Sequence, residues 1–120
     1  MKPSGTLKVK TWYGLSLTVK LFGTAWASIG PLPPHPQLVN IVLRMGLPRE
    51  DSVHLQLLHE TGHLQTLPIL IVLGVLFYYL SLPLFPAVTG LLVISEILAE
   101  SYVMAKEGKN YFRIYRSLWR

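Results

Sequence analysis

The motif His59-Glu60-Thr61-Gly62-His63 holds the side chains of this chain that are best suited to chemistry. On a helix, the two histidines would lie about 400° apart around the axis, so both imidazoles would project from one face. Two neutral imidazoles at that spacing can bind one zinc ion, and Glu60 is then close enough to act on a water at the metal. The motif therefore predicts a zinc site. The alternative is a surface helix that carries two ordinary histidines.

A second pair of ionisable residues, Glu96 and Glu100, ends the most apolar part of the chain. Their four-residue spacing again places both on one helix face. No charged residue occurs from Leu64 to Ser95, and a carboxylate in such surroundings is costly unless it is paired or binds a metal. We therefore expect the glutamates to need a cationic partner, which zinc and its histidines would provide. For Glu100, a place at the membrane interface near the helix end is the alternative.

The two remaining histidines are weaker candidates. His35 lies in the proline-rich loop 30–36, and a histidine between prolines is more often simply exposed than a metal ligand. His54 precedes His59 by five residues, so it would point away from the predicted site.

The elements before the motif have the alternation of β-strands. Apolar side chains occupy every second position from Leu7 to Tyr13, and again from Leu15 to Leu21. Gly14 separates the two runs, which predicts either a hairpin or one long bulged strand. The short apolar run 38–44 is compatible with strand or helix. Together these patterns predict an α+β fold whose β-rich part covers residues 6–44.

Three helices are expected after the β-rich part. The first, 52–66, carries the histidine motif; the second, 68–82, is almost entirely apolar; the third, 86–107, carries the glutamates. Pro83 and Pro86 would lie at the tip of an apolar helical hairpin. A basic amphipathic tail follows at 109–120, in which Phe112, Tyr115 and Trp119 recur at three- and four-residue spacing and would form one stripe.

A straight helix through the first two segments would conflict with a shared site. His63 would lie about 30 Å from the turn near Leu84, whereas Glu96 would lie only about 18 Å from it. Pro68 can end or kink a helix, so we expect a break between residues 65 and 69.

Composition favours a membrane protein. The 120 residues have room for one domain, hydrophobic residues make up 51% of them, and the mean hydropathy is +0.41. Basic residues flank the apolar region at both ends, which predicts a membrane protein with both termini in the cytoplasm. The net charge of +5 lacks the aromatic alternation of a nucleic-acid platform, so no nucleic-acid partner is expected. A soluble protein with a very apolar core is the alternative. So much apolar surface is also compatible with a homo-oligomer.

The motif and the later segment Glu96-x-x-Ala-Glu100 together resemble the gluzincin zinc metallopeptidases. The chain looks closest to the membrane branch of CAAX prenyl proteases and heat-shock-type peptidases, and in size it is similar to the minigluzincins. The resemblance covers residues 50–108 and implies a β-ribbon, an active-site helix and a glutamate helix. Glu100 stands where that branch has Asp, which is one methylene shorter.

The resemblance implies roles for particular residues. His59, His63 and Glu96 would bind one zinc ion, Glu60 would be the general base, and Glu100 would hold His59 from behind. A partner for the oxyanion has no clear counterpart in this sequence. Its candidates are Tyr102, Tyr111, Arg113 and Tyr115.

The function expected from these residues is zinc-dependent peptide-bond hydrolysis at or in a membrane. Glu60 would assist the attack of a zinc-bound water on a peptide or protein substrate. The substrate could bind as an added β-strand whose backbone pairs with residues 15–24 or 38–44. One alternative is a small membrane protein that binds zinc without catalysis, and another is a structural membrane hairpin whose histidines are coincidental.

Overall fold

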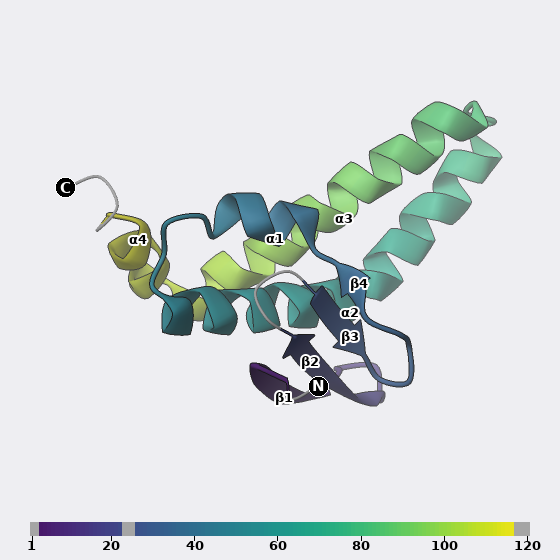
Figure 1. Cartoon of the computed structure of the whole chain (residues 1–120). Helices are drawn as coiled ribbons and strands as arrows, with labels where there is room; N and C mark the ends of the chain where they lie inside the picture. Colours follow the sequence, from purple (N-terminus) through teal and green to yellow (C-terminus); the bar gives the residue numbers. More distant parts are fainter. Residues whose placement is uncertain (1–2, 23–25, 117–120) are drawn as a thin grey trace.

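The computed structural model describes residues 3–22 and 26–116, and its sheet and helices form an α+β fold, as predicted (Figure 1). Four antiparallel strands follow one another in the sheet in chain order. They are β1 (Gly5–Lys10), β2 (Ser16–Phe22), β3 (Trp26–Ile29) and β4 (His35–Pro36). The first two strands form a hairpin, because Gly14 takes a φ of 100° in the intervening turn.

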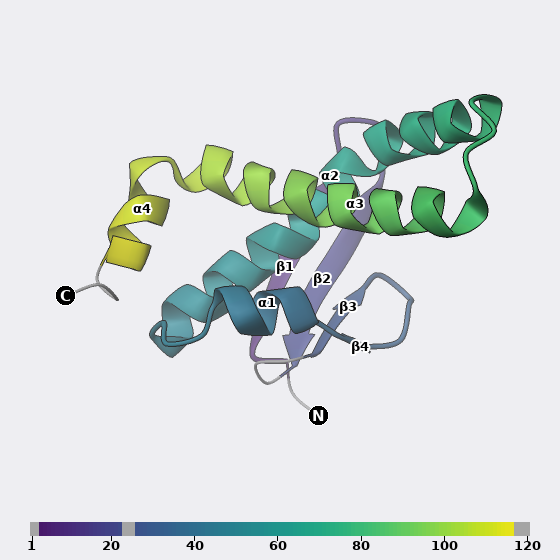
Figure 2. The same cartoon turned by 90° about the horizontal axis from the view of Figure 1, so that it is seen from above.

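Four helices complete the described chain: α1 (Leu38–Leu43), α2 (Arg49–Tyr79), α3 (Leu84–Glu107) and α4 (Lys109–Arg116). The ambiguous apolar run 38–44 is therefore helical. Helix α2 lies between the sheet and α3, and α3 crosses it as the chain returns from the hairpin tip (Figure 2).

The predicted break between residues 65 and 69 is wrong as stated, because α2 is one helix that contains Pro68. Helix α2 contains both segments expected as separate helices, 52–66 and 68–82, except residues 80–82, which follow its end. Figure 1 shows that α2 nevertheless changes direction along its length. A proline inside a helix both removes a hydrogen bond and crowds the preceding turn, which bends the helix without ending it.

The β1–β2 turn satisfies backbone groups beside this proline. Pro68 has no N–H to donate to the carbonyl of Leu64, and the hydroxyl of Tyr13 donates to that carbonyl instead. The indole Nε1 of Trp12 donates to the carbonyl of Gln65 at 2.8 Å. The turn of the β1–β2 hairpin therefore supports the bend in α2, and this support explains why α2 continues through Pro68.

Two apolar clusters hold the helices in place. Val9 and Val19 of the sheet pack against Leu64 of α2. On the other side, Leu55 of α2 packs against Val103 of α3 and Ile114 of α4, with Tyr111. The buried residues of α2 all precede Pro68, so its second half projects beyond this core.

The basic tail forms a helix, but its buried face differs from the predicted stripe of Phe112, Tyr115 and Trp119. Phe112 is exposed, whereas Tyr111 and Ile114 are buried. The reason is that the Tyr111 hydroxyl reaches a carboxylate on α3 and Ile114 enters the core. Trp119 lies outside the described residues.

The projecting part of the helical hairpin is apolar and exposed. Helices α2 and α3 are each long and apolar enough to cross a membrane, by length and composition. At the tip, Leu84 and Phe85 are 80% and 81% exposed. We call the segment 67–93 the apolar arm.

Gly62 sets the distance between α2 and α3. A Cβ atom at this position would lie 2.6 Å from the carbonyl oxygen and 2.8 Å from the Cα of Ala99. Both atoms are backbone, so they cannot rotate away as a side chain would. The glycine inside the histidine motif is therefore what lets the two helices touch.

Gly62→Ala should separate α2 from α3 and lower the free energy of unfolding by about 1–3 kcal/mol, as overpacking does. Gly74→Ala is the matched control, because its Cβ would meet nothing closer than 3.8 Å. A helix-interior Gly→Ala change there should stabilise by up to about 1 kcal/mol. Thermal unfolding followed by circular dichroism measures both, and equal stability of the two variants would contradict the close approach.

Candidate metal centre

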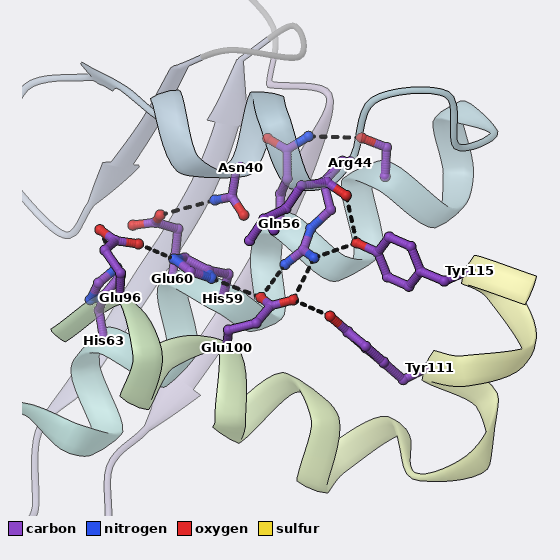
Figure 3. A network of polar contacts seen from close by, with 12 residues as sticks. Asn40, Arg44, Gln56, His59, Glu60, His63, Glu96, Glu100, Tyr111 and Tyr115 are labelled. Carbon is purple, nitrogen blue, oxygen red and sulfur yellow. Dashed lines mark hydrogen bonds and ion pairs between the residues drawn. The ribbon is translucent and has the colours of Figure 1, made fainter. Parts of the chain in front are cut away.

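The side chains of His59, His63 and Glu96 converge between α2 and α3 (Figure 3). One ligand atom from each lies within 4.8 Å of the others, so this group could hold a metal ion. Glu96 lies between the two imidazoles, with Oε2 at 2.7 Å from His59 Nε2 and Oε1 at 3.3 Å from His63 Nε2. The one-turn spacing of the histidines on α2 brings their rings to 4.8 Å between centroids.

The donor set fits zinc. Ligand atoms at about 2.0–2.2 Å around a tetrahedral ion lie about 3.3–3.6 Å from one another. The contact between His63 and Glu96 has this length, and a small rotation of the carboxylate would open the shorter contact with His59. Two imidazoles with one carboxylate also leave a fourth position for water, as catalytic zinc sites require.

In each imidazole, Nδ1, the nitrogen not facing Glu96, contacts a polar side chain. His59 Nδ1 lies 3.1 Å from Oε1 of Glu100, and His63 Nδ1 lies 2.9 Å from Oγ of Ser95. A hydrogen bond donated by Nδ1–H fixes the tautomer in which Nε2 keeps its lone pair. The Nε2 atoms of both histidines face Glu96. With the proton on Nδ1, each would have the lone pair that a metal ligand needs.

Glu60 lies beside this group on α2. It is 1% exposed, and its Oε1 accepts a long hydrogen bond of 3.5 Å from Nδ2 of Asn40. Burial disfavours the ionised form of a carboxyl group and makes it a better base once ionised. Glu60 therefore combines burial with a position beside the metal group.

A cavity of about 400 Å³ gives access to the site, and Glu60, His63 and Glu96 line it. Strand β4 contributes His35 to the same cavity, and α3 contributes Ser95. A larger cavity of about 550 Å³ lies between α1 and the start of α2, but none of the predicted site residues lines it. The predicted site residues that line a cavity are therefore found at the smaller of these two cavities.

The four candidates for an oxyanion partner lie elsewhere. The Tyr111 hydroxyl donates to Glu100 at 2.6 Å, and the Tyr115 hydroxyl donates to the carbonyl of Leu43 at 2.8 Å. The guanidinium of Arg113 is bound to Asn110 on its own helix. The ring of Tyr102 lies under Lys106. None of the four lines the cavity that Glu60 and Glu96 share.

The segments expected to add a substrate strand are also unsuitable. Residues 16–22 form β2, which is paired with β1 on one side and β3 on the other, and residues 38–43 form a helix. The outer strand beside the cavity is β4. An alternating pattern identifies a strand but not the strands that pair with it. The edge strand of the sheet could therefore not be predicted from the sequence.

Sequence patterns do not single out three residues that the structure places at the site. Asn40 comes from α1, Arg44 directly follows α1, and Ser95 precedes Glu96 on α3. Arg44 had a usable signal, because it is a lone cation at the end of an apolar run. The sequence predicts an exposed loop position for His35, but in the structure His35 is half-buried and lines the cavity.

Comparisons with models of known protein families, with curated proteins and with solved structures find no match to this chain. What the chain does must therefore be inferred from the site itself.

Proposed function

We propose that this protein is a zinc-dependent metallopeptidase that hydrolyses peptide bonds at a membrane. The observation that carries the proposal is the convergence of His59, His63 and Glu96 beside a buried Glu60, at a cavity that a substrate can enter. The resemblance of both sequence motifs to the gluzincins supports the same proposal. The three converging side chains would hold the ion.

Zinc in such a site lowers the pKa of a bound water and polarises a carbonyl group. Glu60 would take a proton from the attacking water and pass it to the amine that leaves when the peptide bond breaks. Its buried carboxylate is suited to both steps, since burial strengthens it as a base and keeps bulk water from competing.

The cavity also provides groups for orienting a substrate. His35 approaches from β4 and is the one imidazole of the cavity that is not part of the metal group. We assign to it the hydrogen bond to the substrate carbonyl oxygen, because the tyrosines and arginine suggested by sequence are engaged outside this cavity. A donor aimed at the developing oxyanion is worth several kcal/mol in other hydrolases.

A second function is favoured by one observation. The resemblance gives no clear counterpart for the oxyanion partner, and none of the four candidates from the sequence lines the cavity. A small membrane protein that binds zinc without hydrolysing peptides would need no oxyanion partner in its cavity.

Glu60→Gln should distinguish the two functions. The amide keeps the volume of the side chain but cannot accept a proton, so we expect unchanged zinc content and a loss of hydrolysis of about 100-fold or more. Turnover of a fluorogenic peptide library and zinc content by atomic absorption measure the two effects. Glu50→Gln, in the exposed first turn of α2, is the matched control. Equal activity of Glu60→Gln and wild type would refute the role of Glu60, and a wild type that binds zinc but cleaves no peptide would favour the second function.

We further propose that the apolar arm inserts into the membrane with both termini on the cytoplasmic side. The arm carries no charged residue, and α2 and α3 enter and leave it at the same end. Basic residues precede and follow the apolar arm in the sequence: Lys8, Lys10, Lys20, Lys106, Lys109, Arg113 and Arg116. Such a distribution matches the excess of Lys and Arg in cytoplasmic segments.

Two lysines at the tip of the arm should prevent insertion. We expect wild type to float with vesicles of phosphatidylcholine and phosphatidylglycerol in a density gradient, and Leu84→Lys with Phe85→Lys to float at least 10-fold less. Each charge in hydrocarbon costs about 2.5–3.5 kcal/mol. The control is Val42→Lys with Met45→Lys, which changes two exposed apolar residues near α1. Flotation of the tip variant at the wild-type level would contradict insertion through the arm.

A further inference from the structure

Arg44 is buried beside the metal group and is held by a carboxylate. Its side chain is 1% exposed, and its two terminal nitrogens bind both oxygens of Glu100. Nη1 lies 2.7 Å from Oε2 and Nη2 lies 2.5 Å from Oε1. Two parallel bonds of this kind fix the plane of a carboxylate as well as its position.

The same carboxylate touches the metal group. Oε1 of Glu100 lies 3.1 Å from Nδ1 of His59, whose Nε2 faces Glu96. Oε2 accepts the hydroxyl of Tyr111 at 2.6 Å. Figure 3 shows this continuous path of contacts from Arg44 through Glu100 to the imidazole. We call Arg44, Glu100 and Tyr111 the carboxylate clamp.

Helix α4 supports the clamp from the far side. The hydroxyl of Tyr115 accepts a hydrogen bond of 2.6 Å from Nη1 of Arg44. Hydrogen bonding to Glu100 and its negative charge outweigh the burial of the guanidinium, so the pKa of Arg44 is raised above its usual value. The clamp therefore joins the residue that follows α1 to helices α3 and α4, on the Nδ1 side of His59 of α2.

We propose that Arg44 is a positioning residue for the metal centre, which sets the ring orientation of His59 by clamping Glu100. The proposal rests on the metal site of the proposed function. Glu100 has a flexible side chain, and without the clamp its carboxylate could rotate away from Nδ1 of His59. With the clamp in place, Nδ1–H keeps its acceptor and Nε2 keeps the direction that a ligand needs.

A purely structural role accounts less well for this arrangement. Replacing a buried ion pair by apolar residues of similar volume is often neutral or stabilising, so packing alone does not require Arg44. The Nε atom of Arg44 has no hydrogen-bond partner among the described residues, which adds to the cost of burying it. What the pair does supply is an oriented acceptor for the imidazole.

A double-mutant cycle in zinc affinity tests the proposal with the full chain. Arg44→Met and Glu100→Gln should each weaken zinc binding by about 10–100-fold, measured by competition with a chelating dye. Because Arg44 acts through Glu100, the two losses should not multiply. The zinc affinity of the double variant should be at most about threefold below that of whichever single variant binds zinc more weakly. Losses that multiply in the double variant would overturn the proposal, as would an Arg44→Met variant with wild-type affinity.

Two milder variants keep the test valid if Arg44→Met does not fold. Arg44→Lys retains the charge but not the paired bonds, and Tyr111→Phe removes only a hydroxyl that Glu100 accepts. We expect each to weaken zinc binding by at least threefold while thermal unfolding of the metal-free protein shows a folded chain. Tyr78→Phe, at the exposed hairpin tip, is the control and should bind zinc like wild type. Wild-type zinc affinity in both Arg44→Lys and Tyr111→Phe would contradict the positioning role of the carboxylate clamp.

The outcomes also separate this proposal from the proposed function. A wild type that does not bind zinc would overturn both. A wild type that binds zinc, beside clamp variants that bind it equally well, would overturn only the positioning role of Arg44.

Discussion

The close contact between α2 and α3 at Gly62 is the constraint on which the site depends. The backbone of Ala99 lies where a side chain at Gly62 would be. Because the helices are antiparallel, this contact places His63 opposite Ser95 and Glu96, and His59 opposite Glu96 and Glu100. A larger separation would remove every one of these contacts together. The glycine of the histidine motif therefore has a physical role, although it carries no chemistry.

The second constraint is the burial of charge between the helices. Glu96 and Glu100 stand in a largely apolar helix, and each is matched by groups from elsewhere in the chain. The imidazoles of α2 match Glu96, and the guanidinium of Arg44, directly after α1, matches Glu100. The pKa of Tyr111 is raised, first by burial and then by the negative charge of Glu100, so it stays a hydrogen-bond donor. One polar centre thus holds together four helices that would otherwise share only small apolar clusters.

Local patterns were sufficient to predict much of this arrangement. The alternation before residue 22 predicts strand, as a hairpin or as one long bulged strand, and the structure has the hairpin. The spacings of His59 with His63 and of Glu96 with Glu100 place each pair on one helix face. The bend at Pro68 was mistaken for a break, because its support comes from Tyr13, which is distant in sequence. Arg44 was missed for the same reason, since only the fold brings α1 to Glu100. Periodicity reports which face of an element is apolar, but it does not report which element covers that face.

Zinc content of the purified chain, with and without Glu96, tests the central claim most directly. The account predicts one zinc ion per wild-type chain, its loss in Glu96→Ala, and its retention in Glu50→Ala, which removes an acid from the exposed start of α2. A wild type without stoichiometric metal, or a Glu96→Ala variant that holds zinc as well as wild type, would contradict a site built by α2 and α3 together.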